Sequence, residues 1–304
     1  MRKNKAGNAI RYSAAYKVGQ SINYSLLTLL GVVTLYPFWY CLILSFNNGK
    51  DALKGDIFFW PRVFTLDNYA EAFKHPLIGS SFVISISRTV LVVVVGVFLV
   101  SLMAYALAQK SLPGRSGITF YFYFTQIFGA GLIPTFILYR QLGLLNNYWI
   151  LVLPFLYSFM HTVIVRTYFN TIPPSLPESA RIDGASEFRI FFRIMLPLSV
   201  PTLAAIALFT GVGIWNDWFT GAYFLMRRQN LFPAATLLRQ LLMDIPAVPD
   251  PDTIQDLQWV ANTNSTPESM RLTFLIILTF PIICIYPFLQ KYFIKGVMLG
   301  SVKE

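Results

Sequence analysis

Hydrophobic residues in this sequence gather in six continuous stretches of roughly 20 residues, separated by polar segments. The stretches cover residues 22–46, 88–108, 118–138, 149–169, 200–219 and 272–289. A helix of about 20 residues crosses the hydrocarbon core of a membrane, whereas a spanning strand needs a shorter segment of alternating hydrophobicity. The pattern therefore predicts an all-α membrane protein with six transmembrane helices.

Basic residues predict which ends of these helices face the cytoplasm, because short cytoplasmic loops are enriched in Lys and Arg. Residues 1–21 are basic and carry no acidic residue, the segment 291–304 is also basic, and the loop 170–199 contains Arg181, Arg189 and Arg193. Most acidic residues lie in segments 47–87 and 221–271, which we therefore expect outside. We expect a cytoplasmic N-terminus at 1–21, a transmembrane region at 22–290 and a cytoplasmic tail at 291–304.

Composition supports a membrane protein and argues against binding of nucleic acid. Hydrophobic residues make up 55% of the chain and charged residues only 12%, which is too apolar for one soluble core. The net charge of +10 is divided among the segments between stretches instead of forming one basic face. Cys41 and Cys284 lie inside hydrophobic stretches without metal-ligand spacing, so we expect neither a disulfide framework nor a metal site.

The segment from Ser175 to Pro201 predicts a helix, a bend and a second helix. Ser175 followed by Glu178 is a capping-box pattern that marks the start of a short helix. Gly184 is suited to the left-handed conformation that ends such a helix. The second helix should begin near Ser186, where Glu187 is favourable beside the positive end of the helix dipole.

The second helix presents an aromatic pattern with two interpretations. Phe188, Phe191, Phe192 and Met195 recur at helical spacing, which predicts one apolar face. That face either packs against the helix ends of the same protein or fills a pocket in a partner. Periodicity alone does not separate the two interpretations.

The same segment resembles the EAA motif of bacterial ATP-binding-cassette (ABC) importer permeases. The positions that match the motif are Glu178, Ala180, Gly184, Ile194, Leu196 and Pro197, with Ser179 in place of the first Ala. Asp183 before Gly184 resembles the carbohydrate-importing, maltose-permease-like subfamily, and within it the LplC type. The resemblance extends over most of the chain, including residues 64–69, 215–218 and 291–303.

This resemblance implies a type I ABC importer permease fold in the bacterial cytoplasmic membrane and a role in sugar import, with an oligosaccharide favoured. It implies a heterodimer with a second permease, two cytoplasmic ATPase subunits that use ATP and Mg²⁺, and an external solute-binding protein. The loop 170–199 would be the coupling loop that docks on the ATPase. Its coupling residues would be Glu178, Ala180, Asp183, Gly184, Phe188, Phe191, Phe192, Ile194, Leu196 and Pro197.

Asp217 is the acidic residue within a hydrophobic stretch, and ionisable residues there are often functional. Aromatic and polar side chains suit sugars, so Trp215, Asn216, Asp217 and Trp218 are candidates for the substrate path. The alternative is an interfacial aromatic belt at the outer end of the stretch. We expect Arg88 to extend toward the outer interface and His161 to be a packed, neutral histidine.

Three other functions have less support from the sequence. An enzyme or ATPase is disfavoured because no phosphate-binding loop and no Ser–His or acidic membrane cluster is present. An ion-coupled transporter would ordinarily carry buried acidic or His relays. An ABC importer of a solute other than sugar stays open as an alternative.

Overall fold

The computed structural model describes residues 14–244, 265–281, 283 and 284. These residues form helices and connecting loops, with one isolated antiparallel bridge between Asn47 and Phe64. The chain divides into two compact units, one of Met1–Ala70 with Val248–Ile276 and one of Glu71–Ala247 with Ile277–Glu304. The expected tail 291–304 and residues 1–13 lie outside the described residues.

The first unit is built around the long helix α1 (Ala14–Ser45), which is followed by the short helix α2 (Gly49–Ala52) and the start of α3 (Asp67–Phe73). Its core contains Ile43, Leu44 and Ile57. Asn68 is buried and donates hydrogen bonds to the carbonyl oxygens of Ser45 (3.0 Å) and Asn47 (2.8 Å). These bonds satisfy carbonyl groups where α1 ends, so the chain leaves the helix along a fixed path.

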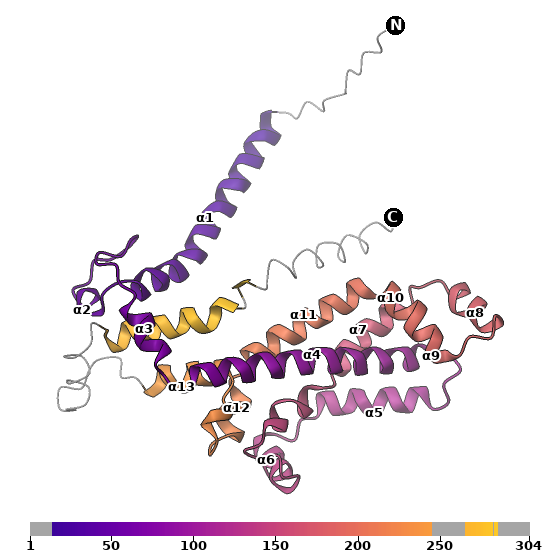
Figure 1. Cartoon of the computed structure of the whole chain (residues 1–304). Coiled ribbons are helices and arrows are strands. Elements are labelled where there is room, and N and C mark those ends of the chain that lie inside the picture. Colours follow the sequence, from indigo (N-terminus) through magenta and orange to yellow (C-terminus); the bar gives the residue numbers. More distant parts are fainter. Residues whose placement is uncertain (1–13, 245–264, 282, 285–304) are drawn as a thin grey trace. The chain divides into compact units, whose positions relative to one another are not determined.

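The second unit is built around α4 (Ile78–Ala108), which packs against α7 (Phe159–Phe169) and α11 (Val200–Asn216), with α5 (Arg115–Ile127) beside α7 (Figure 1). The remaining elements are α6 (Leu132–Gln141), η1 (Tyr148–Leu151), η2 (Leu153–Phe155), α8 (Ser175–Ile182), α9 (Glu187–Ile190), η3 (Phe191–Met195), α10 (Leu196–Leu198), α12 (Phe219–Phe224), η4 (Gln229–Leu231) and α13 (Ala234–Asp244). Because α4 contacts both α7 and α11, it forms the centre of this unit.

The third hydrophobic stretch is broken, which corrects the expected continuous helix at 118–138. Helices α5 and α6 meet at an angle of 112°. Phe128 is extended and Gly131 has a φ of +81°, a left-handed conformation that a helix cannot contain. Gly129 and Gly131 therefore mark a sharp bend.

The other boundaries also differ from expectation. Helix α4 begins at Ile78, ten residues before the predicted 88, so Arg88 lies well inside it. The fourth stretch starts as 3₁₀ turns around Pro154 and bends by 41° before α7. The fifth is helical from Val200 to Asn216, and in the sixth the described residues are helical through residue 281.

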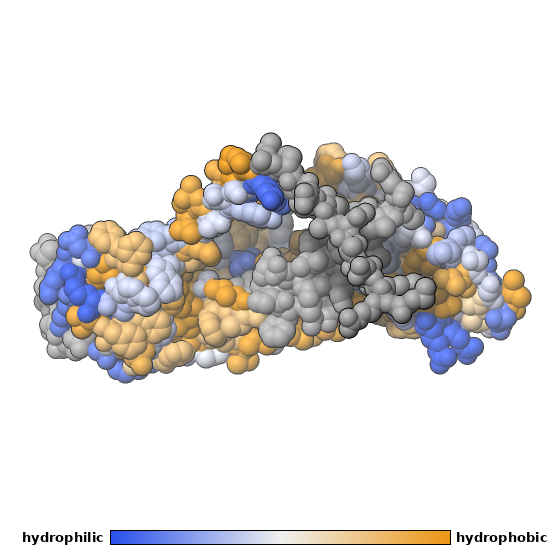
Figure 2. Space-filling view, turned by 90° about the horizontal axis from the view of Figure 1, so that it is seen from above, coloured by the Kyte–Doolittle hydropathy of each residue, from blue (hydrophilic) through white to orange (hydrophobic). Residues whose placement is uncertain are grey.

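Within the described residues, α1 and α4 are each long and apolar enough to span a membrane, and three bent helix pairs pass the same test if each pair is one span. Hydrophobic residues occupy much of the surface drawn in Figure 2. In α1, for example, Leu30 is 59% and Leu35 is 67% exposed. A surface this apolar requires lipid or a partner to cover it.

Candidate functional site

The loop 170–199 folds as a helix, a bend and a second helix, as predicted. Gly184 has a φ of +79°, and its amide donates to Arg181 O at 3.0 Å while the amide of Ala185 donates to Ala180 O at 2.9 Å. This pair of bonds is the Schellman arrangement that ends helices at glycine. Ser186 then begins α9, with its hydroxyl accepting from the amide of Arg189 at 3.4 Å.

The predicted capping box is absent. Pro174 precedes α8, and the amide of Glu178 already donates to the carbonyl oxygen of Pro174 at 3.1 Å. The amide that the Ser175 hydroxyl would have satisfied is therefore engaged, and no side chain caps this end. The Glu178 side chain is exposed beside a cavity of about 590 Å³ that Lys110 and Arg115 also line.

An ion-pair network fastens the bend to the end of α4, which sequence reasoning missed. Arg181 Nε lies 2.7 Å from Glu187 Oε1, and Arg181 also donates to Gln109 Oε1 at 3.0 Å. The Tyr105 hydroxyl donates to Glu187 Oε2. The hydrogen bond from Arg181 lowers the pKa of Glu187, so this carboxylate stays charged at neutral pH.

The predicted single aromatic face is divided, and residues Phe191–Met195 form a π-helical turn. A π turn contains more residues than an α turn, so it shifts every later side chain around the helix. Phe191 is 1% exposed and packs against Tyr105 at 5.3 Å between ring centroids, whereas Phe188 is 69% exposed. Phe192 is half-exposed and stacks on Phe98 of α4 at 6.1 Å.

The outermost part of the bend is apolar. Ile182 is 87% exposed and Phe188 is 69% exposed, and they flank Gly184 in sequence on its two sides. Asp183 is also exposed, whereas Ala180, Ile194 and Leu196 are half-buried against the core beneath the loop. The exposed part of the bend therefore carries two large apolar side chains besides the charged Asp183.

Arg88 and Asp217 form a buried ion pair, which corrects the expectation that Arg88 extends to the interface. Arg88 is fully buried, and its Nη2 contacts Asp217 Oδ2. Its Nε also donates to Leu151 O at 3.0 Å, and its guanidinium lies 5.2 Å from the ring of Phe155. Asp217 Oδ1 accepts from the amide of Thr220 at 3.2 Å. This pair therefore joins α4, the 3₁₀ segment, the end of α11 and the start of α12.

The four candidates for the substrate path do not form one surface. Trp215 is buried, Asn216 is exposed and Asp217 is engaged by Arg88. The guanidinium of Arg239 lies 4.2 Å from the ring centroid of Trp218.

A separate cavity of about 340 Å³ lies between α4, α7 and α11, where the chain bends before α7. Its lining includes Phe155, Ser158, His161, Phe209 and Thr210. His161 Nδ1 lies 3.4 Å from the hydroxyl of Thr210. Among the described residues, no group of three or more His, Cys, Asp or Glu side chains is arranged to bind a metal ion.

The chain is similar to known transport proteins over nearly its whole length. The family described as binding-protein-dependent transport system inner membrane component matches residues 78–299. Protein LplC of Bacillus subtilis (strain 168) is 38% identical over 276 residues, covering 90% of this chain and 91% of LplC. The polygalacturonan/rhamnogalacturonan transport system permease protein YtcP of the same organism is 36% identical, covering 92% of this chain and 96% of YtcP.

A solved structure agrees with these relatives. It is the crystal structure of a bacterial ABC transporter involved in the import of the acidic polysaccharide alginate. One of its chains superposes with a TM-score of 0.86 at 28% identity, covering 94% of this chain and all of that chain. The all-helical fold is therefore that of a type I ABC importer permease.

Proposed function

We propose that this chain, which belongs to the family of binding-protein-dependent transport system inner membrane components, is the permease subunit of an ABC importer for a sugar, in the form of an oligosaccharide. The sugar is supported by the relative named for transport of polygalacturonan and rhamnogalacturonan and by the alginate importer. The 340 Å³ cavity supports it as well, because aromatic rings and hydroxyls together suit a sugar ring and its hydroxyl groups.

In this proposal the protein crosses the bacterial cytoplasmic membrane six times with both termini in the cytoplasm. It pairs with a second, similar permease, binds two ATPase subunits that use ATP and Mg²⁺, and receives solute from an external binding protein. The placement of Lys110, Arg115, Arg166 and Arg181 around the same end of α4 and α7 supports a common cytoplasmic side.

The observation that carries the proposal is the exposed apolar bend of the loop 170–199. Ile182 and Phe188 project from an ordered turn whose base is fixed by the Arg181–Glu187 pair. We propose that this loop is the coupling segment of the permease and that its bend enters a cleft of the ATPase, in the manner of a helix bound in a groove. In this proposal the buried Phe191 packs beneath the loop and maintains its shape. The exposed Asp183 contacts the ATPase at the bend.

Gly184 provides a direct test. Apart from its neighbours in the chain, no atom lies within 4 Å of the Cβ of an added side chain, so a substitution acts through the left-handed backbone and not through a clash. Gly184→Val should strain the bend by about 1–2 kcal/mol and reduce recruitment of the ATPase to membranes. Gly184→Asn is the matched control, because Asn tolerates this conformation. Undiminished recruitment and uptake by Gly184→Val would refute the coupling role.

Uptake into membrane vesicles tests the function as a whole. With ATP and without an ion gradient, vesicles that contain the assembled transporter should accumulate oligosaccharide. Uptake that follows an ion gradient and ignores ATP would indicate a secondary transporter. ATP-dependent uptake of a different solute would retain the importer and overturn the sugar assignment.

A further inference from the structure

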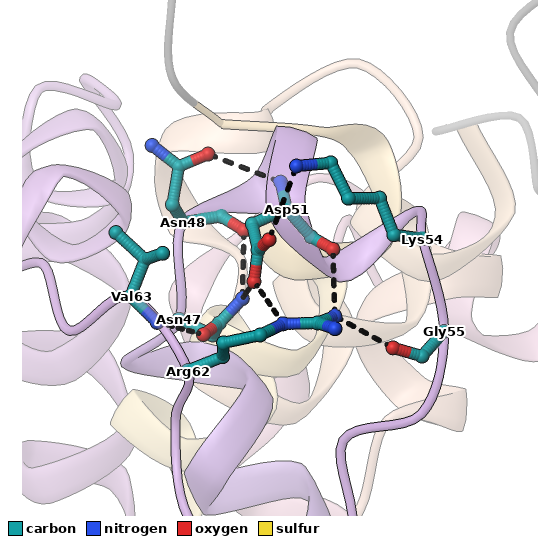
Figure 3. A network of polar contacts seen from close by, with 7 residues as sticks. All are labelled: Asn47, Asn48, Asp51, Lys54, Gly55, Arg62 and Val63. Carbon is teal, nitrogen blue, oxygen red and sulfur yellow. Dashed lines mark hydrogen bonds and ion pairs between the residues drawn. The ribbon is translucent and has the colours of Figure 1, made fainter.

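A closed loop follows α2 in the first unit, and one arginine fastens its base. The loop comprises residues 55–62. Figure 3 shows the side chain of Arg62 pointing toward Asp51 and Gly55, which lie before and at the start of this loop. Its Nη2 donates to Gly55 O at 2.7 Å, and its Nε pairs with Asp51 Oδ2 at 2.9 Å. The loop therefore closes on itself.

Asparagines complete the base of this loop (Figure 3). Asn47 is fully buried, accepts from the amide of Val63 at 2.9 Å and donates to Asp51 Oδ2 at 3.3 Å. The amide of Asn48 donates to Val63 O at 2.9 Å. Hydrogen bonds from Arg62 lower the pKa of Asp51, so the network stays charged at neutral pH. A base satisfied in this way holds the rest of the loop in one position.

The far end of the loop consists of exposed aromatic side chains. Phe58, Phe59 and Trp60 are 55%, 65% and 73% exposed, and we call these three residues the aromatic tip. The preceding Ile57 is buried with Ile43 and Leu44, so the loop is anchored on its inner side. The tip carries no charged side chain, and its one polar side-chain group is the indole N–H of Trp60.

The aromatic tip lies against the side of α1 and does not extend beyond the end of that helix. Trp39 Nε1 donates to Phe59 O at 3.1 Å, and the Tyr36 hydroxyl donates to Phe58 O at 3.4 Å. The rings of Trp39 and Trp60 meet edge to face, with centroids 5.7 Å apart. Tyr36 and Trp39 precede Ser45, the last residue of α1, by about 14 and 9 Å along the helix axis.

We propose that the aromatic tip is a membrane-interface anchor, inserted at the boundary between headgroups and acyl chains of the leaflet nearest the end of α1. The backbone bonds to Tyr36 and Trp39 set the tip beside the apolar part of α1, at the depth where Tyr and Trp rings favour the membrane interface. A sugar would require hydrogen-bond partners for its hydroxyl groups, and the tip offers only the indole N–H of Trp60. This inference rests on one part of the proposed function, namely that α1 spans the membrane. In the proposed orientation, the leaflet nearest the end of α1 is the outer one.

Quenching of Trp60 fluorescence by brominated lipid tests the anchor. The full-length protein and its Trp60→Phe variant are reconstituted in phosphatidylcholine vesicles brominated high on the acyl chain. Their difference in emission isolates Trp60, and Phe preserves an aromatic ring so that folding is unaffected. We expect the lipid to quench most of the Trp60 emission and aqueous iodide to quench little of it.

A second variant asks whether the base of the loop sets this depth. Arg62→Gln removes the ion pair to Asp51, so it should weaken quenching of Trp60 by lipid and strengthen quenching by iodide. Trp60 accessible to iodide alone would overturn the anchor in favour of a soluble ligand. Trp60 protected from both quenchers would overturn it in favour of a protein contact. Neither readout depends on ATP or transport, so failure of the anchor is distinguishable from failure of the proposed function.

Discussion

Replacing Asp217 by Asn removes the charge that balances the buried Arg88. Arg88 has no exposed surface, and its other acceptors are neutral carbonyl oxygens of Leu151 and Asp217 itself. Asn has nearly the same shape as Asp, and its Oδ1 can still accept from the amide of Thr220. The substitution therefore removes one negative charge, and because Oδ1 keeps its bond from Thr220, the NH2 donor of Asn replaces the oxygen that accepted from Arg88.

The expected cost is large. Removing one partner of a buried ion pair costs about 3–5 kcal/mol, a considerable part of the roughly 5–15 kcal/mol that stabilises a typical protein. At about 2 °C per kcal/mol for a chain of this length, the unfolding temperature should fall by roughly 6–10 °C. A further substitution, Arg88→Gln, removes the uncompensated charge, so the double variant should regain part of the loss.

Thermal unfolding of the purified protein in detergent, at one fixed scan rate, measures these differences. Asp56→Asn is the control, because Asp56 is exposed and its φ of +57° suits Asn. An Asp217→Asn protein as stable as the wild type would refute the structural role of the pair. If its sugar uptake also fell, Asp217 would belong to the substrate path after all.

Three further outcomes are expected. Phe191→Ala should lower the stability by about 3–5 kcal/mol, measured by thermal unfolding, because it empties a buried site. Phe188→Ala should change the stability by less than about 0.5 kcal/mol and weaken ATPase binding. Equal losses of stability would contradict a buried role for Phe191 and an exposed role for Phe188. Because Arg181 lowers the pKa of Glu187, the stabilisation from this pair should be complete above the ordinary Glu pKa of 4.5 and lost as pH falls through the lowered value. Hydrogen exchange of the loop should show this, and Arg181→Gln should weaken the dependence, because only the hydrogen bond from Tyr105 then lowers the pKa of Glu187. Arg62→Gln should also open the loop 55–62 to limited proteolysis, and an unchanged cleavage rate would show that the arginine does not close it.

Features set by nearby residues were predictable from the sequence. Gly184 and Ser186 define the bend through backbone conformation and a local cap, and both are present as expected. The prediction of a capping box at Ser175 was wrong, because the helical turn begins one residue earlier and the carbonyl oxygen of Pro174 accepts from the amide of Glu178. A single residue in the flanking turn thus decided which hydrogen bond forms.

Features set by distant residues were not predictable in this way. Arg88 and Asp217 are 129 positions apart, so no spacing rule connects them. The π turn at Phe191–Met195 violates the helical period on which the aromatic face was predicted. The sharp bend of 112° in the third stretch, at Gly129 and Gly131, is another such feature, because glycine permits a bend without fixing its angle.

The contacts of α4 connect the loop 170–199 to the buried ion pair. Tyr105 of α4 bonds to Glu187 in the loop, and Arg88, about 26 Å along the same helix, bonds to Asp217. Helix α11 begins just after the loop and ends beside Asp217, so α4 and α11 are fastened near both ends. Closely packed helices held in this way move together instead of sliding past each other. An Asp217→Asn transporter kept folded at low temperature should therefore still recruit its ATPase and hydrolyse ATP, yet import less sugar for each ATP consumed. An unchanged ratio of sugar imported to ATP hydrolysed would show that motion of the loop reaches the end of α11 at Asp217 by another route.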